Sequence, residues 1–407
     1  MEERRYYGLD ALRGGMMMLG IVLHGTGFYL ASPPTTLPIV TDHNTSPLLD
    51  ILFHFIHSFR MPTFFVMAGF FAALLIEKCG LVGTWKNRAA RILAPFLVAL
   101  LTILPITGLF AVSFMVSARY GGHQLIPDSA QVRMLSGDLA AAGFPIDQPS
   151  PGHLWFLYYL LYFYLLIPIC RILVNASQRF APGVRKLLGS VAMLPLLGLY
   201  AAVTLWPFHG GQVQEGFLFF KPHLPSLIYY GSFFILGYLF HYYQEVLQAC
   251  VRFLAWCGLA ALLLFPLSLY MSHLDNQAAS AAFVVHLAAV VTQGLCTWVL
   301  IYAFVGVAMR HFDRPSPWSL YVSQSSYWVF LVHMPLVAIA AWWLVQYDLH
   351  AIIKFFSVVG FTTVLSFVSY HYWVQKTWIG AFLNGKRFDM QWPWREVVVI
   401  AGEGSKA

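Results

Sequence analysis

Charged side chains are scarce in this sequence, and their scarcity excludes a water-soluble domain. Asp, Glu, Lys and Arg supply only 10% of the 407 residues, whereas 59% of the residues are hydrophobic. A soluble domain of this length needs roughly 25% charged residues to cover its surface. The composition therefore predicts a polytopic membrane protein that lies in a lipid bilayer.

Cysteine and the common soluble-enzyme motifs are also scarce or missing. The five cysteines fall in predicted helices or on the predicted inner side, so no disulfide framework is expected. The sequence contains no G-x-S-x-G elbow, H-E-x-x-H motif, Walker loop or Cys/His metal spacing. These absences argue against familiar hydrolase, metalloprotease and nucleotide sites, and no metal is predicted.

Long apolar runs dominate what is present. They predict an all-α integral membrane protein, a bundle of about ten transmembrane helices. Residues 1–376 form one membrane domain and 377–407 a short cytoplasmic tail, with a short surface helix expected at 129–141 in an outer loop. The runs cover residues 9–31, 49–76, 92–116, 153–174, 187–207, 223–243, 253–273, 280–309, 318–345 and 351–376.

The positions of the basic residues predict the orientation of the bundle. Of the 24 lysines and arginines, only Arg119, Arg133, Lys221 and Lys354 fall at or near predicted outer loops, and Arg60 lies inside a span. The others gather in alternate gaps, which by the positive-inside rule predicts both termini in the cytoplasm and an even number of spans. The formal charge of +7 is thus a topology signal, and no nucleic-acid partner is expected.

The first span carries a polar stripe. Arg13 and His24 are almost three helical turns apart, about 16 Å along the axis, and share a face with Asp10, Met17 and Gly20. An arginine at a helix end can snorkel to the lipid headgroups, which would explain Arg13 alone. That explanation does not cover His24, which lies about 21 Å beyond Asp10, so a functional role is expected for it.

Two further spans place polar groups at a similar depth. Arg60 lies about 16 Å into the second span and shares a face with His57, whereas His333 lies about 22 Å into the ninth span. We expect these side chains to converge with His24 in the outer half of the membrane. The alternative for Arg60 is a structural arginine satisfied by backbone carbonyls near Pro62.

Two weaker signals lie near the predicted membrane surfaces. Lys86, Arg88 and Arg91 precede the third span on the inner side, where they serve either as topology determinants or as a phosphate site. His153 and Trp155 open the fourth span on the outer side. Their residue types suit either an aromatic belt or stacking on a sugar ring.

At these residues the chain resembles the acyltransferase 3 family of integral membrane O-acyltransferases. The pattern of Arg13, ten residues and His24 fits that family's signature, and the segment 88–91 looks like its inner-face Arg-x-x-Arg motif. The segment 64–70 resembles its second-helix motif, although Ala68 stands where the family usually has serine. The similarity runs from about residue 5 to 376.

Three segments resemble one branch of that family more closely, a branch that modifies periplasmic glucans, typically with succinyl groups. They are residues 57–61, 153–157 and 331–336. The resemblance implies a multi-pass protein of the bacterial inner membrane. It also implies a cytoplasmic acyl-CoA donor, with succinyl-CoA expected, and a periplasmic glucan or other glycan as acceptor.

The resemblance also implies roles for individual residues. His24 would act as general base on the acceptor hydroxyl or as a transient acyl carrier. Arg60 would stabilise the oxyanion or pair with a succinyl carboxylate. The remaining expected contributors fall into three sets: His57 and His333 beside the chemistry; Asp10, Arg13, Lys86, Arg88 and Arg91 with the donor; and His153 and Trp155 with the acceptor.

A proton-coupled exporter is the alternative from another class, because the same histidines, arginines and aspartates could form a proton relay. A transporter of this size usually shows paired broken helices in two halves, and the sequence contains no such pairing. The sequence leaves open the identity of the acyl group and of the glycan. It also leaves open whether transfer is direct or passes through an acyl-enzyme, and whether the protein forms a homo-oligomer.

Overall fold

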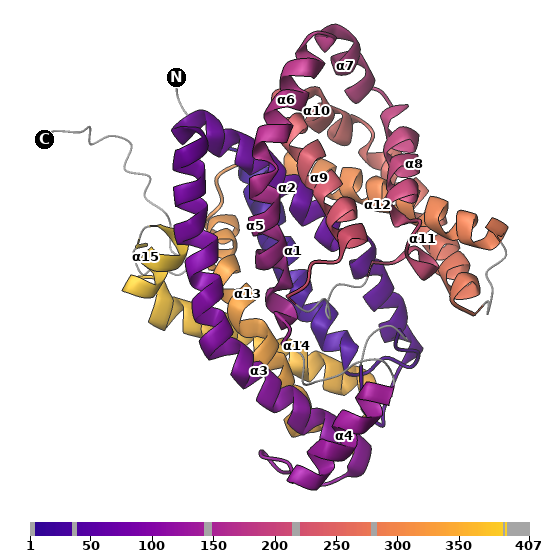
Figure 1. Cartoon of the computed structure of the whole chain (residues 1–407), viewed down its shortest axis with the longest axis vertical. Helices are drawn as coiled ribbons and strands as arrows, with labels where there is room; N and C mark the ends of the chain where they lie inside the picture. The colour runs from indigo at the N-terminus through magenta and orange to yellow at the C-terminus, as the bar shows by residue number, and fades with distance from the viewer. Residues whose placement is uncertain are drawn as a thin grey trace, which may run out of the picture.

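The computed structural model describes residues 5–34, 39–141, 149–213, 220–277, 283–385 and 387–388. Within these ranges every regular element is a helix, so the predicted all-α class is confirmed (Figure 1). Each predicted apolar run coincides with helical structure. The reason is that a chain in lipid must satisfy its backbone hydrogen bonds within the segment itself.

The helices occur along the chain in the following order. The first half contains α1 (Tyr7–Gly27), α2 (Pro47–Arg88), η1 (Ala89–Leu93), α3 (Ala94–Tyr120), α4 (Ser129–Ala141), η2 (Gly152–Leu154), α5 (Trp155–Leu165), α6 (Ile167–Gln178), α7 (Ala181–Leu188) and α8 (Met193–Leu205). The second half contains η3 (His209–Gly211), α9 (Leu224–Tyr242), α10 (Glu245–Arg252), α11 (Leu254–Gln277), α12 (Phe283–His311), α13 (Pro317–Leu344), α14 (Ala351–Ser369), η4 (Tyr370–Val374) and α15 (Trp378–Asn384).

Fewer helices are long and apolar enough to span a membrane than the sequence predicted. Among the described residues, five helical stretches are long and apolar enough to cross a membrane, or up to seven if each of two bent pairs is one span. The bent pairs are α5 with α6, at 53°, and α7 with α8, at 90°. Helix α1 is not among the five, and its polar stripe lowers its hydropathy. Ten spans and the cytoplasmic termini therefore stay predictions.

Helices α2 and α9 pack backbone to backbone. A side chain at Gly69 would collide with the Phe234 carbonyl, and one at Gly237 would collide with the Val66 carbonyl. Such small residues allow close helix approach where lipid offers no hydrophobic drive for association. Gly69, in the 64–70 segment, is thus a point of close contact between α2 and α9.

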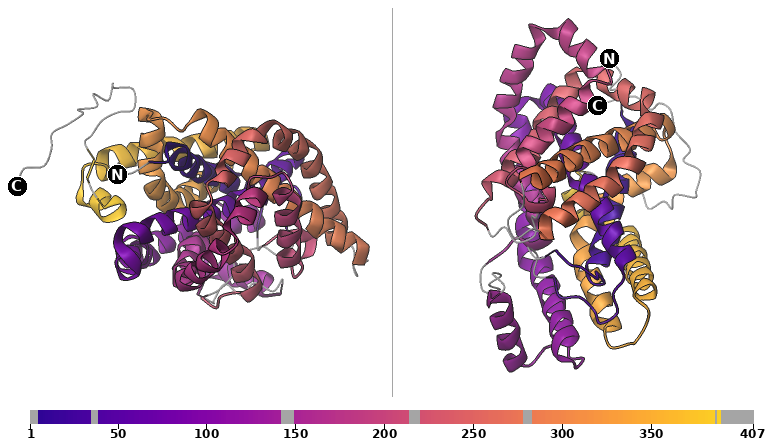
Figure 2. Two further views of the ribbon diagram at one scale, coloured as in Figure 1. Left: turned by 90° about the horizontal axis from the view of Figure 1, so that it is seen from above. Right: turned by 90° about the vertical axis from the view of Figure 1, so that its right-hand side faces the viewer.

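Helix α1 lies inside the bundle. It contacts α2, α12, α13 and α14, and the view from above in Figure 2 shows this indigo helix surrounded by later helices. Its polar stripe consequently faces neighbouring helices and the cavity between them, which avoids the cost of exposing charged groups to lipid.

The connections at the ends of the bundle are also ordered by specific contacts. Asp42, in the loop after α1, forms a fully buried ion pair with Lys354 of α14, with both oxygens 2.8 Å from Nζ. The predicted surface helix at 129–141 is present as α4, whose Leu135 and Leu139 pack against α3. The predicted tail begins with α15, whereas residue 386 and residues 389–407 lie outside the described residues.

Candidate active site

A cavity of about 550 Å³, lined by both apolar and charged side chains, opens between α1, α2, α5, α13 and α15. Three of the predicted donor-binding residues contribute to its wall, namely Arg13, Arg88 and Arg91. The wall is completed by Met17, Phe64, Met67, Ala68, Phe71, Asn87, Ile92, Phe156, Leu157, Leu160, Tyr164, Ser323, Ser326, Tyr327, Leu383, Asn384 and Gly385. This volume lies within the usual range for small-molecule sites.

Arg88 is only partly satisfied by protein groups. Its Nη2 donates to Asn87 Oδ1 at 2.8 Å, and its Nη1 lies 3.4 Å from the Tyr164 hydroxyl. The guanidinium also lies over the Tyr164 ring, 5.3 Å from the centroid. Its Nε is buried and has no hydrogen-bond partner among the described residues. A buried donor without a partner is uncommon and marks a place where a ligand or water can bind.

Arg91 differs from Arg88 because one of its terminal nitrogens, Nη1, is taken up by protein carbonyls. Its Nη1 donates to the carbonyls of Ala381 at 2.6 Å and Phe382 at 2.7 Å. These carbonyls lie in the last turn of α15, where a cation is favoured by the helix dipole. Arg91 therefore holds α15 against the cavity, a role that the sequence did not predict.

Arg13 reaches the same cavity from α1. Its Nη2 donates to Ser323 Oγ at 2.9 Å and pairs with Asp10 at 3.2 Å, while Asp10 also pairs with Arg5 at 3.1 Å. Lys86, in contrast, is exposed and does not line the cavity. Residues two apart on a helix point in different directions, which separates Lys86 from Arg88.

A cluster of histidines lies further along α1. The rings of His24 and His333 are 5.2 Å apart, and those of His333 and His153 are 5.8 Å apart. His57 and Arg60 are close enough to interact electrostatically with His24. The convergence expected from helix depth is therefore present, and it includes His153, which the sequence had placed at an outer interface.

The ring hydrogens in this cluster are fixed by backbone carbonyls. His333 Nδ1 donates to Phe330 O at 2.7 Å, and His153 Nε2 donates to Leu331 O at 3.3 Å, because a carbonyl can only accept. The other nitrogens, His333 Nε2 and His153 Nδ1, are buried without a partner among the described residues. In the neutral rings both nitrogens offer a lone pair to a ligand.

The Arg60 guanidinium lies against Gly20, which is one turn of α1 before His24. Arg60 is 5% exposed, and its Nε donates to the Met16 carbonyl of α1 at 2.9 Å. A side chain at Gly20 would collide with its Nη2, and Gly20 precedes His24 by four residues, about 6 Å of rise. A backbone carbonyl does accept a hydrogen bond from Arg60, as the structural alternative for this residue required. That carbonyl belongs to α1, however, and not to the region of Pro62.

The α1 stripe joins the cavity to the histidine cluster. Arg13 and Met17 line the cavity, and Gly20 and His24 continue the same face toward the cluster. Phe64 lies between them, since it lines the cavity while the Arg60 guanidinium is 5.8 Å from its ring centroid. Ala68, which replaces the family's usual serine, lines the cavity and offers no hydroxyl there.

Trp155 has a different environment from the one that sugar stacking requires. It is 8% exposed, and its ring contacts Tyr159 at 5.4 Å and Tyr230 at 5.5 Å. Protein aromatics thus surround it, and a sugar contact stays a prediction.

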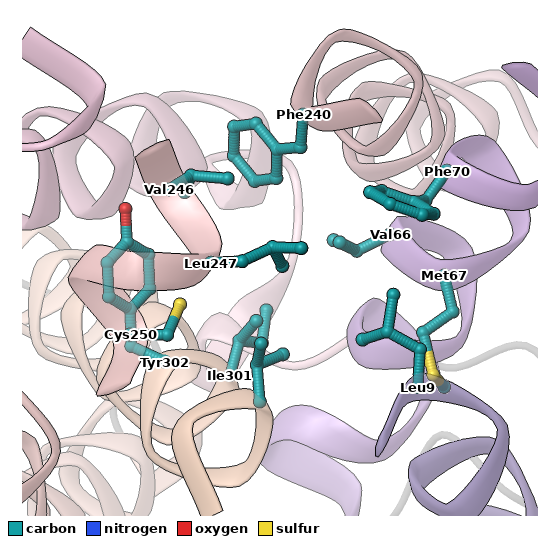
Figure 3. Close-up of a pocket in the computed structure, with 11 residues that line it drawn as sticks. Leu9, Val66, Met67, Phe70, Phe240, Val246, Leu247, Cys250, Ile301 and Tyr302 are labelled. Carbon is teal, nitrogen blue, oxygen red and sulfur yellow. The ribbon is translucent and has the colours of Figure 1, made fainter. Parts of the chain in front are cut away.

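A second cavity, of about 20 Å³, is wholly apolar and lies among side chains such as Leu247 and Ile301 (Figure 3). It offers a ligand no polar anchor.

Comparisons with known proteins identify the family to which the chain belongs. A family model described as an acyltransferase domain matches residues 6–371. Glucans biosynthesis protein C of Escherichia coli strain K12 is 26% identical over 346 residues, which cover 82% of each chain. The protein of the same name from Escherichia coli O139:H28 is 26% identical over 349 residues, again 82% of each chain. No solved structure matches the chain. Because the acyltransferase model spans nearly its whole length, this membrane protein belongs to the acyltransferase 3 family.

Proposed function

We propose that this protein transfers an acyl group from cytoplasmic acyl-CoA to a hydroxyl group of a glycan on the periplasmic side of the bacterial inner membrane. The observation that carries the proposal is the α1 stripe, which runs from Arg13 in the cavity to His24 in the histidine cluster. A stripe of this kind suits a thioester donor that enters from one side while the acceptor enters from the other.

The cavity suits the donor end. Arg88 has a buried Nε without a protein partner, and Arg13 keeps 40% of its side chain exposed. Planar guanidinium groups bind phosphate oxygens through paired hydrogen bonds. We expect Arg88 and Arg13 to contact the phosphates of CoA directly, whereas Arg91 acts by holding α15. Apolar residues such as Leu160 and Phe64 would flank the pantetheine arm.

The histidine cluster suits the chemical step. His24 would accept the proton of the acceptor hydroxyl while its oxygen attacks the thioester carbonyl. The carbon–sulfur bond then breaks, and the CoA sulfur leaves as thiolate and takes up a proton. Arg60, one turn away, would stabilise the negative oxygen of the tetrahedral intermediate. His333, whose Nδ1 is held by Phe330 O, would keep the His24 ring in place.

The acceptor is inferred from the relatives, and the acyl group from the resemblance of residues 57–61, 153–157 and 331–336. The curated relatives carry the name glucans biosynthesis protein C, which supports a glucan as acceptor. A succinyl group is the first candidate, and its carboxylate is the alternative partner of the Arg60 guanidinium if that group does not bind the oxyanion. His153, which joins the histidine cluster, is the residue through which we expect the acceptor to contact the site.

The test is acyl transfer by the purified full-length protein in detergent, with succinyl-CoA or acetyl-CoA and periplasmic glucan. Free thiol release and the mass of the glucan are measured together. His24→Ala should lower turnover by about 10²–10⁴-fold without changing the folded fraction, since a general base contributes that much. His311→Ala, at an exposed end of α12, is the matched control. Near-native turnover by His24→Ala would make His24 a packing residue, and no thiol release by the wild type would favour an exporter.

A further inference from the structure

Three possible metal ligands lie close together at a site that includes no residue of the histidine cluster. His209 comes from η3, Asp275 from the end of α11 and His286 from the first turn of α12. One ligand atom from each lies within 4.8 Å of the others. The elements that carry them also contact one another, since α12 packs on α8 and α11, and η3 packs on both α11 and α12.

The hydrogen bonds of His286 leave one nitrogen facing a carboxylate. Its Nε2 is 2.9 Å from the Trp206 carbonyl, which can only accept, so Nε2 carries a hydrogen. In the neutral ring Nδ1 then presents a lone pair, and it lies 2.9 Å from Asp275 Oδ2, another acceptor. Two acceptors at this distance require a cation between them, either a proton or a metal ion.

Asp275 adds a second reason to expect a cation. Its side chain is fully buried, and Oδ2 accepts a hydrogen bond of 2.7 Å from Gly210 N–H. Its Oδ1 is buried and has no hydrogen-bond partner among the described residues. A buried carboxylate oxygen without a partner is costly, and a coordinated metal ion would satisfy it.

We propose that His209, Asp275 and His286 bind a divalent transition-metal ion of the zinc class. Two imidazoles and a carboxylate are a common zinc ligand set that leaves the fourth position to water or another ligand. The Trp206 carbonyl orients His286 as second-shell acceptors orient metal-bound histidines. Metal–ligand bonds of about 2.1 Å bring ligands within about 4.2 Å of one another. The exposed His209 ring would therefore move slightly inward.

The metal would fasten a loop that reaches toward the histidine cluster. Residues 209–213 follow α8, and Gly210 and Gly211 have φ of +65° and +62°, which let the chain turn back onto α11 and α12. Gln212 in the same loop hydrogen bonds to His54 Nδ1 at 2.5 Å. His54 precedes His57 by three residues on α2, so the metal site and the cluster share this connection.

The test uses the full-length protein, purified in detergent without a polyhistidine tag and stripped with a chelator. Zn²⁺ titration followed by calorimetry should show one tight site per chain, and Co²⁺ should give the strong visible absorption of a tetrahedral site. His209→Ala should weaken Zn²⁺ binding roughly 100-fold or more, because even second-shell changes cost 10–100-fold. This substitution is on an exposed residue, so the variant should stay folded.

His273→Ala is the matched control, because His273 is an exposed histidine two residues from Asp275 on α11. Its Zn²⁺ affinity should equal that of the wild type. Absence of a stoichiometric site, or equal affinity of the wild type and His209→Ala, would overturn the proposal. His286 and Asp275 would then form a protonated imidazole–carboxylate pair, and Zn²⁺ would not change thermal unfolding.

Discussion

The substitution Gly20→Ala should distinguish the contribution of Arg60 to activity from its contribution to stability. The Cβ of Gly20→Ala would collide with Arg60 Nη2, so the guanidinium must move away from α1. Loss of the charged hydrogen bond to Met16 O costs about 1.5–3 kcal/mol. Replacing a helical glycine with alanine returns about 1 kcal/mol of helix propensity. The net change in stability should therefore be small, about 0.5–2 kcal/mol.

The expected effect on activity is larger than the effect on stability. If the guanidinium stabilises the transition state by about 1.5–3 kcal/mol, its displacement lowers kcat by roughly 10–150-fold. Gly15→Ala is the matched control, because nothing lies within 4 Å of a side chain at that exposed position of the same helix. Acyl-transfer turnover and thermal unfolding are measured for both variants. Equal turnover of the two alanine variants would refute a catalytic contribution from the position of Arg60.

Three other predictions address the donor, the acyl group and the fold. Arg88→Ala should raise the KM for acyl-CoA roughly 10–150-fold with little change in kcat, whereas Arg91→Ala should also lower the Tm; unchanged KM for Arg88→Ala would remove that residue from the donor site. Arg60→Lys should abolish succinyl transfer and spare acetyl transfer if the guanidinium binds the succinyl carboxylate, and should impair both if it binds the oxyanion; undiminished transfer with both donors would make Arg60 structural. Asp42→Asn should destabilise the fold by about 3–5 kcal/mol, because it leaves the Lys354 charge buried; a detergent-phase unfolding curve that matches the wild type would contradict this.

The extents of the helices could be predicted because lipid permits few backbone structures. A long apolar run in a membrane must be helical, and the runs at 9–31 and 351–376 coincide with α1 and α14. The bends could not be predicted in the same way. A 53° break falls between α5 and α6, inside the single run 153–174, where apolar side chains satisfy either a straight or a bent helix.

The site could be predicted in part. The 3.6-residue period places Arg13 and His24 on one face with no tertiary information, and helix depth brought His333 toward His24. Contacts between elements that are far apart in the sequence leave no periodic pattern from which they could be predicted. Arg91 meets the carbonyls of α15, which the sequence placed in a cytoplasmic tail. Trp155 lies inside an aromatic core, an environment that differs from both the interfacial belt and the sugar-stacking site that its sequence position suited.

Docking of α15 and binding in the cavity are thermodynamically linked. Asn384 and Gly385 form part of the cavity wall, and Arg91 attaches the last turn of α15 to the start of the third span. A molecule that contacts this wall when α15 is docked has a higher affinity for the docked state. By reciprocity, whatever free energy that molecule adds to docking, docking adds to its binding. Docked α15 thereby raises the affinity of the cavity for such a molecule without taking part in the reaction.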